Sequence, residues 1–125
     1  VTESRRSAEA LRQANERLRA VLASITDAYV ELDEDLRFVE VNPVAERILG
    51  RPAAELLGRA VLDVFPEVEG TAILQEYRAA LATGRQRHFE SWSPAARRWL
   101  EVHTYPRGGR LEVYYRDVTE RRQAE

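Results

Sequence analysis

The chain has 125 residues, of which 44% are hydrophobic and 32% charged, and its formal net charge is −2. This composition is typical of one globular domain with attached segments, and the slightly negative charge argues against nucleic acid as a main partner. The lack of cysteine excludes disulfides, thiolate metal sites and cysteine-linked chromophores. Because no apolar run approaches the roughly 18 residues of a membrane span and no signal-peptide pattern is present, we expect a cytoplasmic protein without membrane contact in this chain.

Residues 1–26 are predicted to form an N-terminal helix, because positions 3–26 contain neither glycine nor proline. Its apolar side chains recur in alternating steps of three and four, which is typical of a coiled-coil seam. The seam residues are Leu11, Asn15, Leu18, Leu22 and Ile25. A single asparagine on such a seam favours a two-stranded coiled coil, so a homodimer is one interpretation and a helix packed against its own domain is the other.

Alternation of apolar and polar side chains predicts five strands, at residues 28–33, 36–41, 86–92, 98–105 and 110–118. Three helices are expected between the second and third strands, at residues 42–50, 53–57 and 71–83. Asn42 before Pro43 indicates a capped helix start, and Gly50 indicates a left-handed helix end. This order predicts an α+β domain whose antiparallel sheet buries one face under the helices.

The last strand is expected to run directly into another helix, which begins at residues 120–125. Asp117 or Thr119 can accept a hydrogen bond from the free N–H groups of a helix start. Arg116 falls on the strand face opposite Tyr115. We therefore predict that Arg116, Asp117 and Thr119 relay a change in the strand to the C-terminal helix.

Three stretches carry a family resemblance, namely Leu32–Gly50, Pro52–Arg59 and Tyr114–Arg121, the last of which contains Asp-Val-Thr. In this order and spacing they resemble the PAS domain family, the sensory modules of bacterial signalling proteins such as sensor histidine kinases. The resemblance implies a PAS domain over residues 27–119, with a five-stranded antiparallel sheet flanked by short helices and a pocket between them. It also implies that residues 120–125 begin a C-terminal signalling helix.

The expected pocket residues follow from strand alternation and helical spacing. They are Val30, Leu32, Ile48, Val61, Leu74, Tyr77, His88, Glu90, Trp92, Leu100, Val102, Thr104, Val113 and Tyr115. A histidine and a carboxylate two residues apart on one strand face lie ~7 Å apart, so His88 and Glu90 could share a polar ligand. Two alternatives are an ordinary polar edge strand, or a register shifted by one residue that buries Phe89 instead.

The opposite face of the sheet is predicted to be unusually aromatic. Its expected residues are Tyr29, Trp99, Glu101, His103, Tyr105 and Tyr114. Large exposed aromatic surfaces are rare in monomers. We therefore expect this face to be covered by residues 3–26 or by a second protomer.

The resemblance also bears on cofactors. The flavin light sensors of the family carry a cysteine where this chain has Ala60-Val61-Leu62, so a covalent flavin adduct and a thioester chromophore are excluded. The long helix at 71–83 lacks the axial histidine of haem-binding members, so haem is not expected. Two histidines alone do not make a metal site, and no catalytic constellation is present, so we predict neither a metal site nor an enzyme.

The first functional hypothesis is a PAS sensory and dimerisation domain of a histidine kinase that binds a small apolar or amphipathic ligand, a fatty acid for instance. The second is a structural dimerisation module with a filled core and no ligand. The third is a redox sensor with non-covalent haem or flavin. Sequence alone does not separate them, and the ligand's identity stays open.

Overall fold

The computed structural model describes residues 27–124 of the chain. The predicted N-terminal helix and its seam therefore lie outside the described residues. The strands are β1 (Ala28–Leu32), β2 (Phe38–Val41), β3 (Arg87–Ser93), β4 (Arg98–Arg107) and β5 (Arg110–Asp117). The helices are α2 (Pro43–Leu49), α3 (Ala53–Leu56), α4 (Val61–Val64), the 3₁₀ turn η1 (Pro66–Val68), α5 (Ala72–Thr83) and α6 (Thr119–Ala124).

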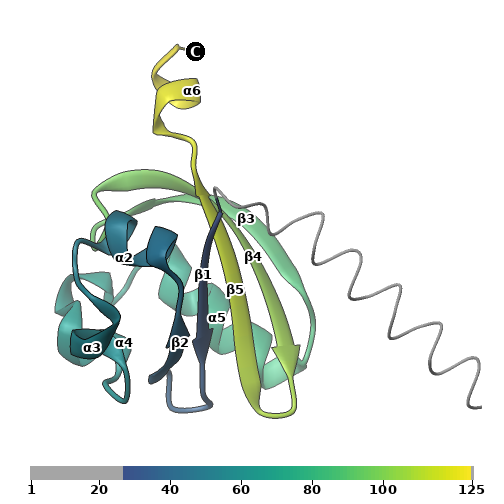
Figure 1. Ribbon diagram of the computed structural model, residues 1–125. Helices are drawn as coiled ribbons and strands as arrows, with labels where there is room; N and C mark the ends of the chain where they lie inside the picture. Colours follow the sequence, from purple (N-terminus) through teal and green to yellow (C-terminus); the bar gives the residue numbers. More distant parts are fainter. Residues whose placement is uncertain (1–26, 125) are drawn as a thin grey trace, which may run out of the picture.

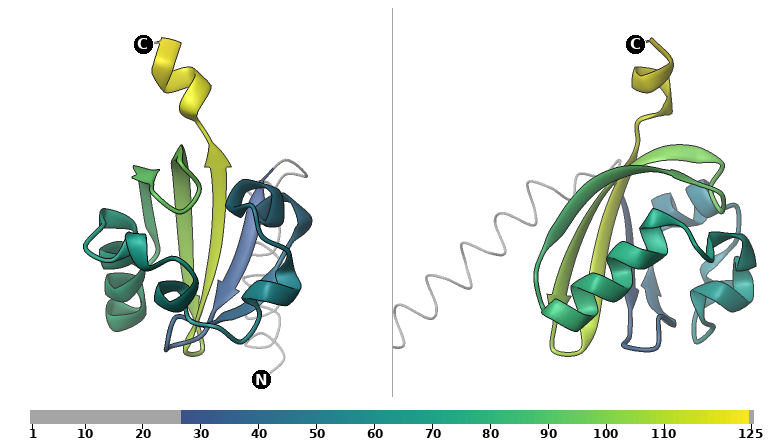
Figure 2. Two further views of the ribbon diagram at one scale, coloured as in Figure 1. Left: turned by 90° about the vertical axis from the view of Figure 1, so that its left-hand side faces the viewer. Right: turned by 180° about the vertical axis from the view of Figure 1, so that it is seen from behind.

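The five strands form one antiparallel sheet in the order β2-β1-β5-β4-β3, which confirms the predicted fold class. Strand β5 lies in the middle of the sheet, between β1 and β4. Helices α2 to α5 all lie on one side of the sheet, which curves around them (Figures 1 and 2). Helix α6 continues directly from the end of β5 (Figure 1).

Asn42 ties the start of the sheet to the first helix, which explains why the chain turns there. Its Oδ1 accepts hydrogen bonds from the N–H of Ala45 at 2.9 Å and from the N–H of Tyr29 at 3.0 Å. Its Nδ2 donates to the carbonyl of Asp27 at 3.2 Å. One side chain thus caps α2, as predicted, and also fixes the beginning of β1.

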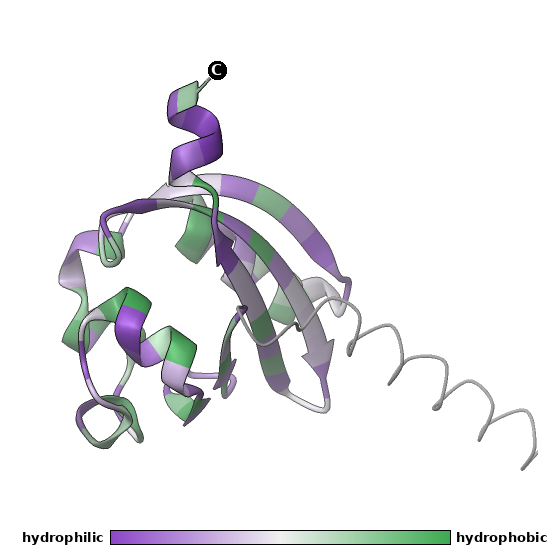
Figure 3. Ribbon diagram, turned by 45° about the horizontal axis from the view of Figure 1, so that its top comes forward, coloured by the Kyte–Doolittle hydropathy of each residue, from purple (hydrophilic) through white to green (hydrophobic). Residues whose placement is uncertain are grey.

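The core lies between the inner face of the sheet and the helices, as the alternating hydropathy of the strands requires (Figure 3). Its largest fully buried side chains are Leu32, Leu56, Leu74, Leu111, Val102, Val113 and Thr104. Five of these seven residues come from strands, so the strand alternation predicted from the sequence accounts for most of the core.

Alternate side chains of strand β3 face the opposite sides of the sheet from those expected. Its residues His88, Glu90 and Trp92 lie opposite His103, Glu101 and Trp99 of β4, on the outer face. The prediction that these three residues face the pocket is wrong, and the alternative register that turns Phe89 inward is confirmed. The physical reason is that Phe89 packs against the core cluster, while Trp92 remains 43% exposed.

Candidate functional site

A small apolar cavity of about 50 Å³ lies between the inner sheet face and the helices. Six of the predicted pocket residues line it, namely Leu32, Val61, Leu74, Tyr77, Leu100 and Tyr115. Five others are buried in the surrounding structure without lining the cavity, namely Val30, Ile48, Val102, Thr104 and Val113. His88, Glu90 and Trp92 belong to the outer face instead.

Sequence reasoning missed part of the cavity wall. The additional lining residues are Phe38, Leu49, Phe65, Val68, Ile73, Ser93 and Ala95. Phe65 and Val68 belong to the segment around α4 and η1, where the elements are only four and three residues long. Elements this short show no periodicity, so only the density of apolar residues before Pro66 gave a signal.

Tyr115, a residue of the cavity wall, has a buried hydroxyl without a hydrogen-bond partner among residues 27–124. Burial raises the pKa of the Tyr115 phenol well above its ordinary value, and the nearby Tyr77 raises that pKa further. Burial likewise raises the pKa of Tyr77 on α5. Both phenols are therefore protonated near neutral pH, and the Tyr115 hydroxyl keeps a donor that no group among residues 27–124 accepts.

The junction of β5 and α6 is held by the residues predicted as a relay. The carboxylate of Asp117 accepts from the N–H of Thr119 at 2.9 Å and from the guanidinium of Arg98 at 3.1 Å. The hydroxyl of Thr119 accepts from the N–H of Trp99 at 2.8 Å. The start of α6 is thus bonded both to its own strand and to β4. Of the two predicted acceptors at the helix start, Asp117 accepts the N–H of the helix, whereas the Thr119 hydroxyl accepts the N–H of Trp99.

Arg116 connects the end of β5 to the first described residue of the domain. Its guanidinium donates to the two carboxylate oxygens of Asp27 at 3.0 and 3.5 Å. The pKa of Arg116 is raised by this hydrogen bond and by the charge of Asp27. The Asp27 carboxylate is only 4% exposed, whereas the Arg116 side chain is 53% exposed, so the pair joins a buried carboxylate before β1 to a half-exposed guanidinium near the end of β5.

A family model described as the PAS fold matches residues 22–123. The chain belongs to the PAS family. No curated protein sequence matches it. No helix among the described residues of this PAS domain is long and apolar enough to cross a bilayer.

Solved structures with the same fold include signalling proteins. A sensory box sensor histidine kinase from Vibrio cholerae is 17% identical, with a TM-score of 0.65 over 90% of this chain and 98% of that chain. A domain of an HTR-like protein from Haloarcula marismortui is 20% identical, with a TM-score of 0.64 over 75% and 99%. The RpfR quorum-sensing receptor PAS domain from Cronobacter turicensis, in complex with BDSF, is 19% identical, with a TM-score of 0.64 over 78% and 98%. At these identities the likeness establishes the fold.

Two arginine side chains of helix α6 contact the outer sheet face of this PAS domain, through ion pairs and an aromatic ring. Arg121 and Arg122 both bond the carboxylate of Glu90 on β3, the latter at 3.1 Å. The hydrogen bond from Arg121, followed by the one from Arg122, lowers the pKa of Glu90. The guanidinium of Arg122 also lies 4.0 Å from the ring centre of Trp99. Glu90 therefore holds the C-terminal helix rather than a ligand in the pocket.

A second group of titratable side chains gathers elsewhere on the outer face. The rings of His88 and His103 stack with centres 4.1 Å apart and planes 7° apart. Burial, followed by the proximity of His88, lowers the pKa of His103, while Glu101 opposes that change. His103 and Glu101 were predicted to face outward, and they do. His88 joins them because strand β3 adopts the alternative register, with Phe89 on the inner face.

Proposed function

We propose that this PAS domain is the sensory module of a cytoplasmic signalling protein, most simply a sensor histidine kinase, that dimerises through residues 1–26. A small ligand occupies the apolar cavity, and β5 relays its presence to α6. The single observation that supports this proposal is that Tyr115 lines the cavity and its buried hydroxyl has no partner in residues 27–124.

The cavity wall favours an amphipathic ligand with one polar group. An unpaired buried hydroxyl costs about 1–3 kcal/mol, so a guest that hydrogen-bonds Tyr115 recovers free energy that the empty domain lacks. The rest of the wall is almost entirely apolar and suits a hydrocarbon chain. A fatty acid has this chemistry. The RpfR receptor domain from Cronobacter turicensis has been solved in complexes with BDSF and with C12:0.

The size of the cavity requires that binding widen it. A cavity of about 50 Å³ is smaller than the roughly 150 Å³ that accommodates benzene in a protein core. The part of the wall that comes from α4 and η1 consists of elements of four and three residues, which have few internal hydrogen bonds. Segments of this kind open at low free-energy cost, so we place the entry route there.

Strand β5 provides the route outward. Tyr115 lies two residues before Asp117, which caps the start of α6. A ligand that binds Tyr115 differently in two arrangements of β5 shifts the population between them, and α6 follows because it continues from the same strand.

One alternative has support of its own. The small cavity volume favours a structural dimerisation module whose core is essentially filled. Such a module would share the fold and the junction at Asp117 but would bind nothing in the cavity.

Native mass spectrometry of the 125-residue chain separates the two. Purified protein is mixed with dodecanoic acid, and the bound fraction is measured for wild type and Tyr115→Phe. We expect one retained molecule per chain and at least about tenfold weaker binding in the variant, since 1.4 kcal/mol corresponds to tenfold.

Tyr114→Phe is the matched control, because it removes the same hydroxyl from the neighbouring residue on the outer face. It should bind like the wild type. Protein that takes up no dodecanoic acid, or equal binding by Tyr115→Phe, would favour the structural module.

A further inference from the structure

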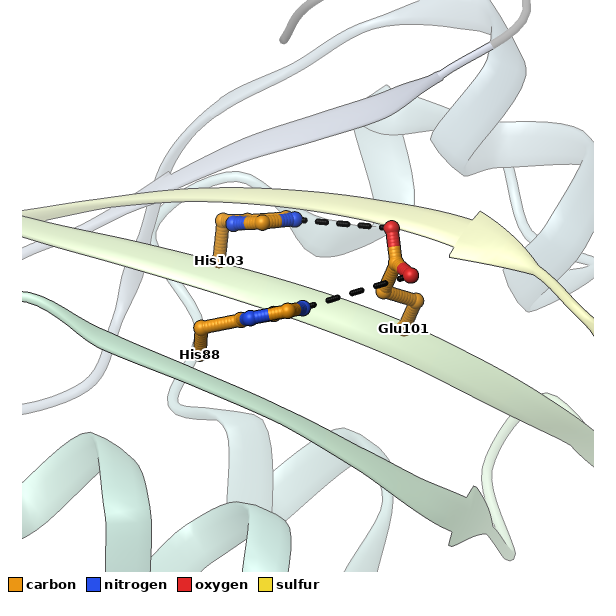
Figure 4. Close-up of side chains that lie close together, drawn as sticks. All are labelled: His88, Glu101 and His103. Carbon is orange, nitrogen blue, oxygen red and sulfur yellow. Dashed lines mark hydrogen bonds and ion pairs between the residues drawn. The ribbon is translucent and has the colours of Figure 1, made fainter.

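Three metal-ligating side chains meet on the outer face of the sheet, away from the cavity. His88 of β3 lies directly opposite His103 of β4, and Glu101 precedes His103 by two residues on the same face. The Nε2 of His103 is 3.5 Å from one carboxylate oxygen of Glu101, and the Nε2 of His88 is 4.0 Å from the other. Figure 4 shows both imidazoles directed toward the same carboxylate.

These distances are close to those of a coordinated ion. Zinc binds imidazole nitrogen and carboxylate oxygen at about 2.0–2.2 Å, which in a tetrahedron places neighbouring ligand atoms roughly 3.3–3.6 Å apart. The three possible ligand atoms here all lie within 4.8 Å of one another. Small rotations of the side chains, which splay the stacked rings so that both lone pairs converge, close the remaining gap.

We propose that His88, Glu101 and His103 bind a divalent transition-metal ion, with zinc as the expected ion and water as its fourth ligand. Two imidazoles and a carboxylate are a common zinc ligand set, and they suit the hard ions magnesium and calcium poorly. The site is separate from the ligand cavity and does not rest on the proposed sensory function.

The surroundings leave room for the ion. A hollow of about 200 Å³ is lined by the three ligands together with Asp27, Tyr114, Tyr115 and Arg116. It is large enough for a metal ion and its water molecules. The imidazole of His88 is 59% exposed, which leaves an open path for the ion from solvent.

The charges around the site are compatible with a cation. Arg116 faces the same hollow, but its guanidinium is bonded to the carboxylate of Asp27. Glu90, opposite Glu101, is bonded to Arg121 and Arg122 of α6. Glu101 is therefore the carboxylate best placed to neutralise an ion held by the two imidazoles.

The scaffold holds the ligands at a fixed spacing. Strands β3 and β4 pair over seven consecutive positions, from Arg87 with Thr104 to Ser93 with Arg98. Ligands on paired strands need only side-chain movement to reach an ion, so little ordering entropy opposes binding.

The small number of possible nitrogen and sulfur ligands in the sequence simplifies the test. The chain contains two histidines and no cysteine, so any imidazole-dependent binding must use His88, His103 or both. Zinc chloride is titrated into the 125-residue protein, prepared without a histidine tag, by isothermal titration calorimetry in a non-chelating buffer. We expect one saturable zinc per chain and no binding of magnesium.

The variants His88→Gln, His103→Gln and Glu101→Gln should each weaken zinc binding at least about tenfold, the smaller end of the loss seen when metal-site partners are removed. Glu90→Gln is the matched control, because it alters a neighbouring carboxylate that contacts α6, and it should bind zinc like the wild type. Zinc should also raise the melting temperature of the wild type, and not that of His103→Gln, since an ion that binds only the folded state stabilises it.

Circular dichroism in zinc-free buffer first establishes that each variant is folded. Absence of saturable zinc binding by the wild type would overturn the proposal. Unchanged affinity in the folded His88→Gln/His103→Gln double variant would overturn it equally, as would one zinc shared between two chains.

Discussion

The two faces of the sheet are built from alternate residues of the same strands but have opposite chemistry. The inner face carries Leu111, Val113 and Tyr115 of β5 and packs under the helices. The outer face carries Tyr114, whose ring meets those of Tyr29 and Tyr105 at an angle, and Arg116, which forms an ion pair. Because one strand supplies both faces, any displacement of β5 changes the cavity wall and the contacts of the chain ends together. This coupling is what makes the central strand a suitable relay.

The aromatic side chains of the outer face contact one another. Tyr114 contacts Tyr29 at a ring-centre distance of 4.9 Å and Tyr105 at 5.8 Å. Burial, followed by the charges of Glu31 and Glu112, raises the pKa of Tyr29. The aromatic rings thus cover one another in part. Coverage by residues 3–26 or by a second protomer stays a prediction.

The largest expected effect concerns the packing of the inner face. Leu111→Ala should lower the free energy of unfolding by about 2–5 kcal/mol, because Leu111 is fully buried on the inner face. Leu57→Ala should change it by about 0.5 kcal/mol or less, because Leu57 is 46% exposed. Urea unfolding measures both. Equal losses would contradict a tightly packed inner face.

The ion pair between Arg116 and Asp27 comes next. Arg116→Gln should lower the free energy of unfolding by about 1–2 kcal/mol, since the buried Asp27 carboxylate loses two charge-assisted hydrogen bonds. Arg110→Gln, which breaks a more exposed pair with Glu31, is the control and should cost under about 1 kcal/mol. If both variants unfold at the same urea concentration, the pair at the chain ends has no special role.

A third prediction concerns the ion pairs between Glu90 on the outer face and the two arginines of α6. Glu90→Gln should accelerate amide hydrogen exchange in residues 119–124, because Arg121 and Arg122 lose their shared carboxylate. Exchange in the core strands should not change. The control is Glu55→Gln on α3, where an exposed carboxylate is neutralised far from α6 in the chain. Unchanged exchange in α6 of the Glu90 variant would show that these bonds do not hold the helix.

The smallest expected effect lies at the edge of the sheet, where Arg87 of β3 bonds Glu76 of α5. The hydrogen bond from Arg87 lowers the pKa of Glu76 in the folded state below its ordinary 4.5. The stabilisation is therefore complete above pH 4.5 and is lost as the pH falls through the folded-state pKa. Glu76→Gln should be slightly less stable than wild type at pH 7, and the difference should shrink in acid. A pH-independent difference would contradict this assignment.

The sequence predicted the elements with strong alternation or clear caps. Leu111, Val113 and Tyr115 alternate with polar residues, and Asn42 marks a helix start, so β5 and α2 were predicted correctly. The prediction for β3 turned the wrong face inward, because the strand carries a large aromatic residue on each face, Phe89 on one and Trp92 on the other. Burial of Phe89, not hydrophobicity alone, decides its orientation.

The candidate sites were less predictable for a related reason. The pairing of His88 with His103 depends on the register of two strands, which no local pattern specifies. Once β3 is turned by one residue, His88 leaves the pocket and joins Glu101. The cavity wall from Phe65 and Val68 likewise depends on how short irregular segments fold back on the sheet.

Amide hydrogen exchange with and without saturating dodecanoic acid tests the central claim, that cavity occupancy is relayed through β5 to α6. We expect the ligand to change exchange both at the cavity wall and in residues 117–124. We also expect Tyr115→Phe at the same ligand concentration to lose both changes. Altered exchange at the cavity wall of the wild type, with residues 117–124 unaffected, would contradict the relay.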